Sequence, residues 1–153
     1  MKMNIEVMPE CEIAYIRQIG PYGRRNIQTM ERLKAWATMN YLLNEDSIIL
    51  GIPQDNPETT NPENCRYDVC LITAADQSIQ DDDVSKGKIS ESNYAVFEID
   101  HTAEAVQQAW YEIFQELSSH GYEMDGSKPI VERYATKMVK NHRCEICVPI
   151  VNR

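Results

Sequence analysis

A single carboxylate interrupts an otherwise apolar strand pattern near the end of the chain. Glu132 lies in the segment PIVERYA, and the two-residue period of a β-strand places Ile130, Glu132 and Tyr134 on one face. Burying an unpaired carboxylate costs several kcal/mol, so the pattern has two interpretations. Either the strand is solvated and Glu132 lies in water, or Glu132 forms the floor of a pocket where its charge is available to a cation.

Tyrosine supplies most of the aromatic side chains. The sequence has eight tyrosines and two tryptophans but only two phenylalanines. A tyrosine combines an apolar ring with a polar tip, and the faces of aromatic rings attract cations. The tyrosines that fall in predicted strands and loops are Tyr15, Tyr22, Tyr67, Tyr94, Tyr122 and Tyr134. As a group they favour the pocket interpretation of Glu132.

The cysteines do not form a recognisable metal or disulfide pattern. Cys144 and Cys147 have the spacing of half a zinc site, but zinc needs four ligands. Their segment, RCEICVPIV, alternates like a strand, in which positions three apart point to opposite faces. An odd number of cysteines also argues against a disulfide framework. We expect free thiols at all five positions, Cys11, Cys65, Cys70, Cys144 and Cys147. We predict neither a metal nor a cofactor.

The charge of the chain argues against a nucleic-acid partner. Fifteen Lys and Arg against 24 Asp and Glu give a net charge of −9, whereas proteins that grip a phosphate backbone carry a basic face. The densest basic group, Arg24, Arg25, Arg32 and Lys34, is diluted by Glu31. We expect no direct nucleic-acid binding.

The apolar segments of the chain are short. No run approaches the ~20 apolar residues that span a bilayer, and the opening MKMNIEVMPE lacks the apolar core of a signal peptide. We therefore expect no membrane segment and a cytoplasmic location.

The order of predicted elements is strand, helix, strand, strand, and it occurs twice. The expected ranges are strand 11–19, helix 26–43 and strands 47–52 and 66–73, a polar connector over 76–88, then strand 93–99, helix 102–120 and strands 129–136 and 143–151. Apolar stripes on both helices need a sheet to cover them. The pattern predicts an α+β fold over residues 1–153, in which two pseudo-twofold modules, about 1–80 and 88–153, form one curved, mostly antiparallel sheet with a cleft between the halves.

Four segments, in order, resemble one known family. They are AYIRQIGPYG, ILGIPQDNPETTNPENCRYDVCL, NYAVFEI with the helix after it, and GYEMDGSKPIVERY followed by EICVPI. Together they are similar to the GyrI-like family, which also occurs as the effector-binding domain of AraC-type and MerR-type transcription regulators. The resemblance implies a stand-alone effector-binding domain whose central cleft binds drugs, dyes and hydrophobic cations, the property called multidrug binding.

The same resemblance implies site residues. The family's cleft glutamate matches Glu132, with Tyr134 beside it, and two further family tyrosines match Tyr22 and Tyr67. We add Tyr94 and Trp110 as candidate ligand contacts.

The chain also departs from the family at two points. IDHTAEAV lacks the glycine-containing turn that often precedes the second helix, and Glu116-Leu117-Ser118 stands where a Trp-Leu-Pro-like segment is expected. This departure removes a cleft tryptophan, for which Trp110 or Trp36 could substitute.

Three functions follow from these observations as expectations. The first is binding of a hydrophobic, cationic small molecule for effector sensing or sequestration. The second is hydrolysis of a strained electrophile with Glu132 as catalytic general base. The third is inhibition of DNA gyrase. The protein partner that we expect is gyrase or a regulator. We expect a monomer or a weak dimer.

Overall fold

The described part of the chain folds into eight strands, three α-helices and one 3₁₀ helix. The computed structural model describes residues 1–151, and its elements are β1 (Lys2–Met8), β2 (Cys11–Ile19), α1 (Arg24–Met39), β3 (Ile48–Pro53), the short 3₁₀ helix η1 (Pro62–Asn64), β4 (Arg66–Thr73), β5 (Ser85–Ile89), β6 (Ser92–Asp100), α2 (Ala103–Ser119), β7 (Val131–Ala135), α3 (Thr136–Val139) and β8 (Arg143–Pro149). No helix within the described residues is long and apolar enough to cross a membrane.

The strands form one sheet in which every pair is antiparallel. Over residues 1–151 the eight-stranded order is β1-β6-β8-β7-β3-β4-β2-β5. The central pair, β3 and β7, joins β3-β4-β2 on one side to β7-β8-β6 on the other. The predicted α+β class with a single antiparallel sheet is confirmed.

The two outermost strands are exchanged between the halves. β1 precedes β2 in the chain but pairs with β6, and β5 precedes β6 but pairs with β2. The sequence pattern does not predict β1, and it assigns most of β5 to the connector 76–88. Both strands are largely exposed, so neither shows the apolar run of a buried strand. Each half of the sheet is therefore completed by a strand from the other half.

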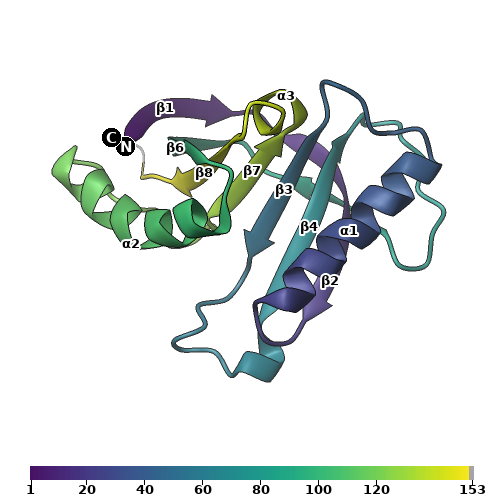
Figure 1. Cartoon of the computed structure of the whole chain (residues 1–153), viewed down its shortest axis with the longest axis horizontal. Coiled ribbons are helices and arrows are strands. Elements are labelled where there is room, and N and C mark those ends of the chain that lie inside the picture. Colours follow the sequence, from purple (N-terminus) through teal and green to yellow (C-terminus); the bar gives the residue numbers. More distant parts are fainter. Residues whose placement is uncertain (152–153) are drawn as a thin grey trace.

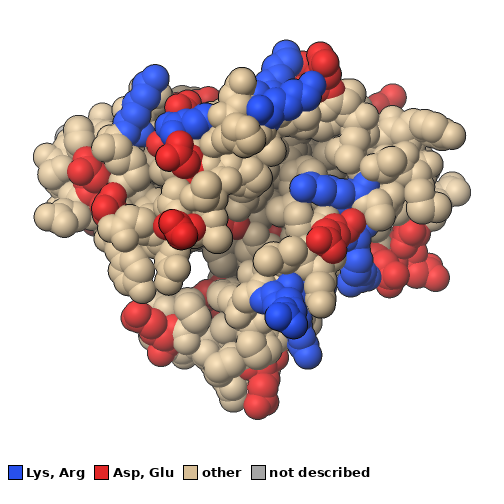
Figure 2. Space-filling model, viewed as in Figure 1, with Lys and Arg blue, Asp and Glu red and all other residues tan. Residues whose placement is uncertain are grey.

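The two long helices lie on the same face of the sheet, which we call the front face (Figure 1). Leu33 and Ala37 of α1 pack with Ala14, Val69 and other residues of the first half. On α2 and the strands beneath it, the buried residues include Ala109, Ile113, Leu117, Phe97 and Ile146. Between the helices, β3 and β7 run through the middle of the sheet, and Figure 2 shows the front surface hollowed there. The opposite, rear face carries a third cluster: Met8, Ile13, Leu50, Ile52, Cys70, Tyr94, Val96, Val131 and Cys147.

Both long helices end in a Schellman motif, but with different residues. In α2 the left-handed position is Gly121 (φ 79°), and Tyr122 N–H donates to Leu117 C=O; this end lies where the glycine predicts it. In α1 the left-handed position is Tyr41 (φ 58°), and Leu42 N–H donates to Ala37 C=O. Helix α1 therefore ends at Met39 and not at residue 43, because a tyrosine occupies the position that a glycine usually marks.

Candidate functional site

Glu132 projects from β7 on the front face, beside the central strand β3. Its neighbour Val131 belongs to the cluster on the rear face, so strand alternation places Glu132 on the opposite side. The hydroxyl of Tyr67, on β4, donates a hydrogen bond of 2.6 Å to Glu132 Oε1. Tyr134, two positions along β7, packs against both front-face clusters. The carboxylate thus lies where the two halves of the sheet meet.

Gly51 makes room for the contact between Tyr67 and Glu132. It is the register partner of Glu132 across the central strand pair. A Cβ atom at Gly51 would lie 2.2 Å from Tyr67 Oη and 2.6 Å from Glu132 Oε1. Any side chain here would occupy the space of the hydrogen bond. We did not predict Gly51 as a site residue, although a glycine inside the apolar strand SIILGI is a signal of close approach.

The carboxylate of Glu132 has aromatic neighbours and no cationic partner. Within residues 1–151, no ion pair joins it to a lysine or arginine. Burial raises the pKa of Glu132 above its ordinary value, and hydrogen-bonding interactions with Tyr67, Trp110 and Tyr134 oppose that rise. Burial, followed by the charge of Glu132, raises the pKa of Tyr67 and of Tyr134. Both phenols therefore stay protonated, and Tyr67 donates to the carboxylate.

The other predicted contacts fall in three different places. Trp110 reaches Glu132 from α2 and is partly buried against the α2 cluster. Tyr22 lies behind Tyr67, with ring centroids 6.1 Å apart, and its hydroxyl donates to Arg66 C=O at 2.8 Å. Tyr94 is on the rear face, where it packs in the third cluster. The structure therefore gathers Glu132, Tyr67, Tyr134 and Trp110, places Tyr22 behind them and leaves Tyr94 on the other side of the sheet.

His101 is a neighbour of the site that the sequence did not indicate. Its ring centroid lies 5.5 Å from that of Tyr134. Burial lowers its pKa, with smaller contributions from Lys34 and His142, and favours the neutral ring. A neutral imidazole leaves the negative charge of Glu132 uncompensated.

The cysteine pair at the end of the chain is divided between the two faces. Cys144 lies in the α2 cluster and Cys147 in the rear cluster, as strand alternation predicts. Burial raises the pKa of Cys144 to about 11 and that of Cys147 to about 12. All five thiols are free, and within residues 1–151 no group of three or more His, Cys, Asp or Glu residues could hold a metal ion.

A family model described as the GyrI-like small molecule binding domain matches residues 1–151. The chain belongs to the GyrI-like family. Among GyrI-like relatives, it is 45% identical over 151 residues to YosT of Bacillus subtilis (strain 168), an SPbeta prophage-derived protein named as a candidate transcriptional regulator, and the match covers 98% of this chain and 99% of YosT. It is 29% identical over 138 residues to a DNA gyrase inhibitor of Edwardsiella piscicida, covering 88% and 86% of the two chains.

Solved structures share the GyrI-like fold at low sequence identity. EcmrR in its DNA complex superposes with a TM-score of 0.75 at 14% identity; the match covers 99% of this chain but only 58% of EcmrR. SAV2435 bound to tetraphenylphosphonium gives a TM-score of 0.60 at 18% identity, with coverage of 99% and 95%. A hydrolase from Listeria innocua gives 0.66 at 11%, with coverage of 98% and 92%.

Proposed function

We propose that the front-face hollow around Glu132 binds hydrophobic organic cations, as an effector-sensing or sequestering site. The observation that carries the proposal is a partly buried carboxylate with aromatic neighbours and no cationic partner among the described residues. A ligand cation at ~4 Å from such a carboxylate gains about 4 kcal/mol at an effective dielectric of 20, before desolvation. Aromatic faces add about 0.5–2 kcal/mol each. These terms favour a lipophilic cation over a neutral molecule of equal size.

The relatives support the same chemical class. SAV2435, which shares the fold, is bound to tetraphenylphosphonium, a bulky aromatic cation. The relative YosT is named as a regulator, which fits a sensing role for this chain. We place this activity in the cytoplasm, because five free thiols are typical of a reducing compartment.

The geometry favours binding over hydrolysis. Hydrolysis is the alternative suggested by the hydrolase from Listeria innocua, which shares the fold. A general base needs a lone pair free for a water molecule. Here the hydrogen bond from Tyr67 to Glu132 Oε1 and the interactions with Trp110 and Tyr134 engage up to three of the about four lone pairs of the carboxylate and lower its basicity. Turnover of an electrophilic ligand by the purified protein would favour the hydrolase; unchanged recovery of the ligand would favour binding.

Calorimetric titration with tetraphenylphosphonium and with tetraphenylborate tests the proposal, because the two ions share a shape and differ in charge. Glu132→Gln should weaken binding of the cation by about 1–3 kcal/mol and should not weaken binding of the anion. The control Glu31→Gln, on the exposed surface of α1, should change neither. Equal losses for both ions in Glu132→Gln would show that Glu132 shapes the site without selecting charge.

The pH provides an independent check on the same interaction. Protonation removes the negative charge of Glu132, so affinity for the cation should fall as the pH is lowered through the raised pKa of this group. The loss should begin above the pH range of an ordinary glutamate and should be absent in Glu132→Gln. An affinity that is independent of pH in the wild-type protein would contradict the proposal.

A further inference from the structure

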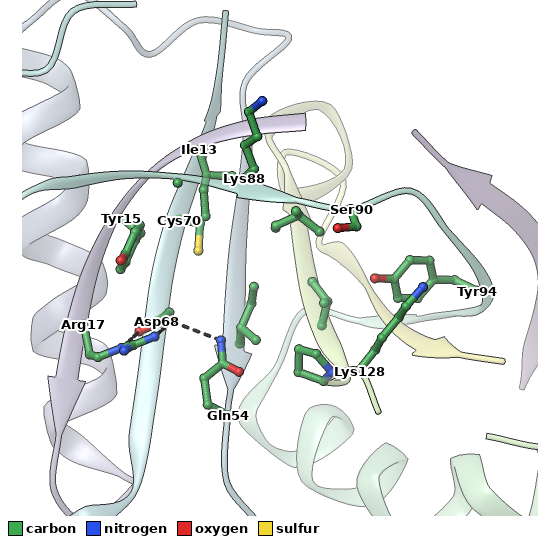
Figure 3. A pocket seen from close by; sticks show the side chains of 15 residues that line it. Ile13, Tyr15, Arg17, Gln54, Asp68, Cys70, Lys88, Ser90, Tyr94 and Lys128 are labelled. Carbon is green, nitrogen blue, oxygen red and sulfur yellow. Dashed lines mark hydrogen bonds and ion pairs between the residues drawn. The ribbon is translucent and has the colours of Figure 1, made fainter. Parts of the chain in front are cut away.

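A second cavity lies on the rear face, behind the site of Glu132. Its volume is about 340 Å³, within the range of small-molecule sites. Strands β2 to β7 line it, together with residues just after β3, between β5 and β6, and just before β7 (Figure 3). Strand β5, which pairs with β2, contributes Gly87, Lys88 and Ile89 to the lining, so residues of both halves of the chain line the cavity.

The two sites lie back to back on the same three strands. Asp68, Ile52 and Val131 line the rear cavity. Each is the chain neighbour of a residue at the front site: Tyr67, Gly51 and Glu132 respectively. Because successive side chains of a strand point to opposite faces, the sheet separates the two sites.

One wall of the rear cavity carries a carboxylate, Asp68, whose charge is already neutralised by an arginine. Arg17 donates to both oxygens of Asp68 at 2.8 Å. Gln54 donates to Asp68 Oδ2 at 3.1 Å, and Asp68 is only 4% exposed. Because the guanidinium of Arg17 neutralises its charge, Asp68 is not available to attract a cation. This carboxylate differs in that respect from Glu132.

The remaining charges of the lining are positive. Lys88 and Lys128 also line the cavity, so the lining has three cations and one carboxylate in a chain of net charge −9. Lys88 forms ion pairs with Glu10 and Glu12. Lys128 Nζ instead donates to neutral acceptors, the hydroxyl of Ser92 at 3.0 Å and a main-chain carbonyl at 3.4 Å.

Lys128 is therefore the least compensated charge of this lining. Within residues 1–151 no ion pair joins it to a carboxylate, and Asp125 acts on it only at longer range. In Figure 3 it lies with Tyr94 on one side of the cavity, away from the Arg17 and Asp68 pair. The floor between them is apolar, with Ile52 and Val131 buried.

We propose that the rear cavity is a second ligand site, which binds a small organic anion with an apolar body. Its acidic group binds at Lys128, and its body lies on Ile13, Ile52 and Val131 beside the ring of Tyr94. The front and rear sites thus select opposite charges on opposite faces of one sheet. The rear site does not depend on the function proposed for Glu132.

The test uses anilinonaphthalene sulfonate and its neutral counterpart N-phenylnaphthylamine as fluorescent probes. The sulfonate should bind one equivalent of the wild-type protein, and Lys128→Gln should weaken it about tenfold. Neutral-probe affinity should change by less than about twofold in that variant. Lys140→Gln is the matched control, because Lys140, at the C-terminal end of α3, is exposed, is paired with Glu45 and does not line the cavity. It should leave both probes unaffected.

Two further measurements locate the bound sulfonate. Ile89→Trp, on the partly buried edge of the cavity, should weaken both probes by filling the space, while Glu132→Gln should leave the sulfonate unchanged. Methyl resonances of Ile13, Ile52 and Val131 should shift on titration. The proposal is overturned if the sulfonate fails to bind at about 1 mM, if Lys128→Gln and Lys140→Gln behave alike, or if Glu132→Gln removes the binding.

Discussion

At the scale of single residues, the front site depends on the absence of a Cβ atom at Gly51. Gly51→Ala would place a methyl group 2.2 Å from the hydroxyl of Tyr67, and Tyr67 is only 6% exposed and cannot move away freely. We expect the variant to lose its hydrogen bond between Tyr67 and Glu132 and about 1–3 kcal/mol of unfolding free energy, as in other overpacked interiors. Urea denaturation measures this loss, and tetraphenylphosphonium affinity should fall with it.

The chain offers a matched control for that substitution. A Cβ at Gly126 would meet no atom within 4 Å, so Gly126→Ala should change stability by less than about 0.5 kcal/mol. If the two variants unfold at the same urea concentration, the ring of Tyr67 moves aside and the space at Gly51 is not required.

At the scale of elements, helix α2 brings Trp110 to the carboxylate, and its start is fixed by one side chain. Thr102 Oγ1 accepts a hydrogen bond of 3.0 Å from Ala105 N–H. Thr102→Ala should cost about 1 kcal/mol of unfolding free energy, whereas Thr102→Asp should retain most of it, because aspartate is also a good N-cap. Urea denaturation of the two variants decides the point. A similar loss in both would mean that the cap contributes little to α2.

At the scale of the whole molecule, the exchanged strands make the halves interdependent. A protease site inserted at Asp82, in the exposed acidic connector, would divide the chain before β5. The nicked protein should remain a complex of two fragments, because three strand pairs, β1–β6, β2–β5 and β3–β7, cross the cut. Once separated in urea, neither fragment should refold alone, and mixing them should restore the circular dichroism of the intact protein. A folded isolated fragment would contradict this interdependence.

The sequence predicts the elements whose signals are local. The apolar stripe, Thr102 and Gly121 define α2 to within a residue of its observed ends. The end of α1 is missed, because Tyr41 adopts a left-handed backbone conformation that its residue type does not predict. The exchanged strands are missed for another reason: their partners lie far away in the chain, and their outer surfaces are in water.

In the candidate site, too, the features with a local sequence signal are predicted and those that depend on the folded sheet are not. Alternation in PIVERYA separates Glu132 from Val131, which the structure places on the rear face. Alternation alone does not say which face of a strand meets the helices, and Tyr94 was assigned to the Glu132 site although it lies on the rear face. The rear cavity has no signal in the sequence, because its lining comes from six strands and three loop segments that meet only in the folded sheet.

The exchange of edge strands also sets the order in which the chain can fold during synthesis. Lys2 pairs with Glu98 and Cys11 pairs with Ile89, so the first strands emerge from the ribosome long before their partners exist. Until then β2 has an open edge, the kind of surface that invites pairing with other chains. Contacts between residues so distant in sequence also slow folding. The arrangement that ties the mature halves together thus leaves the edge of β2 open in the nascent chain until β5 has been made.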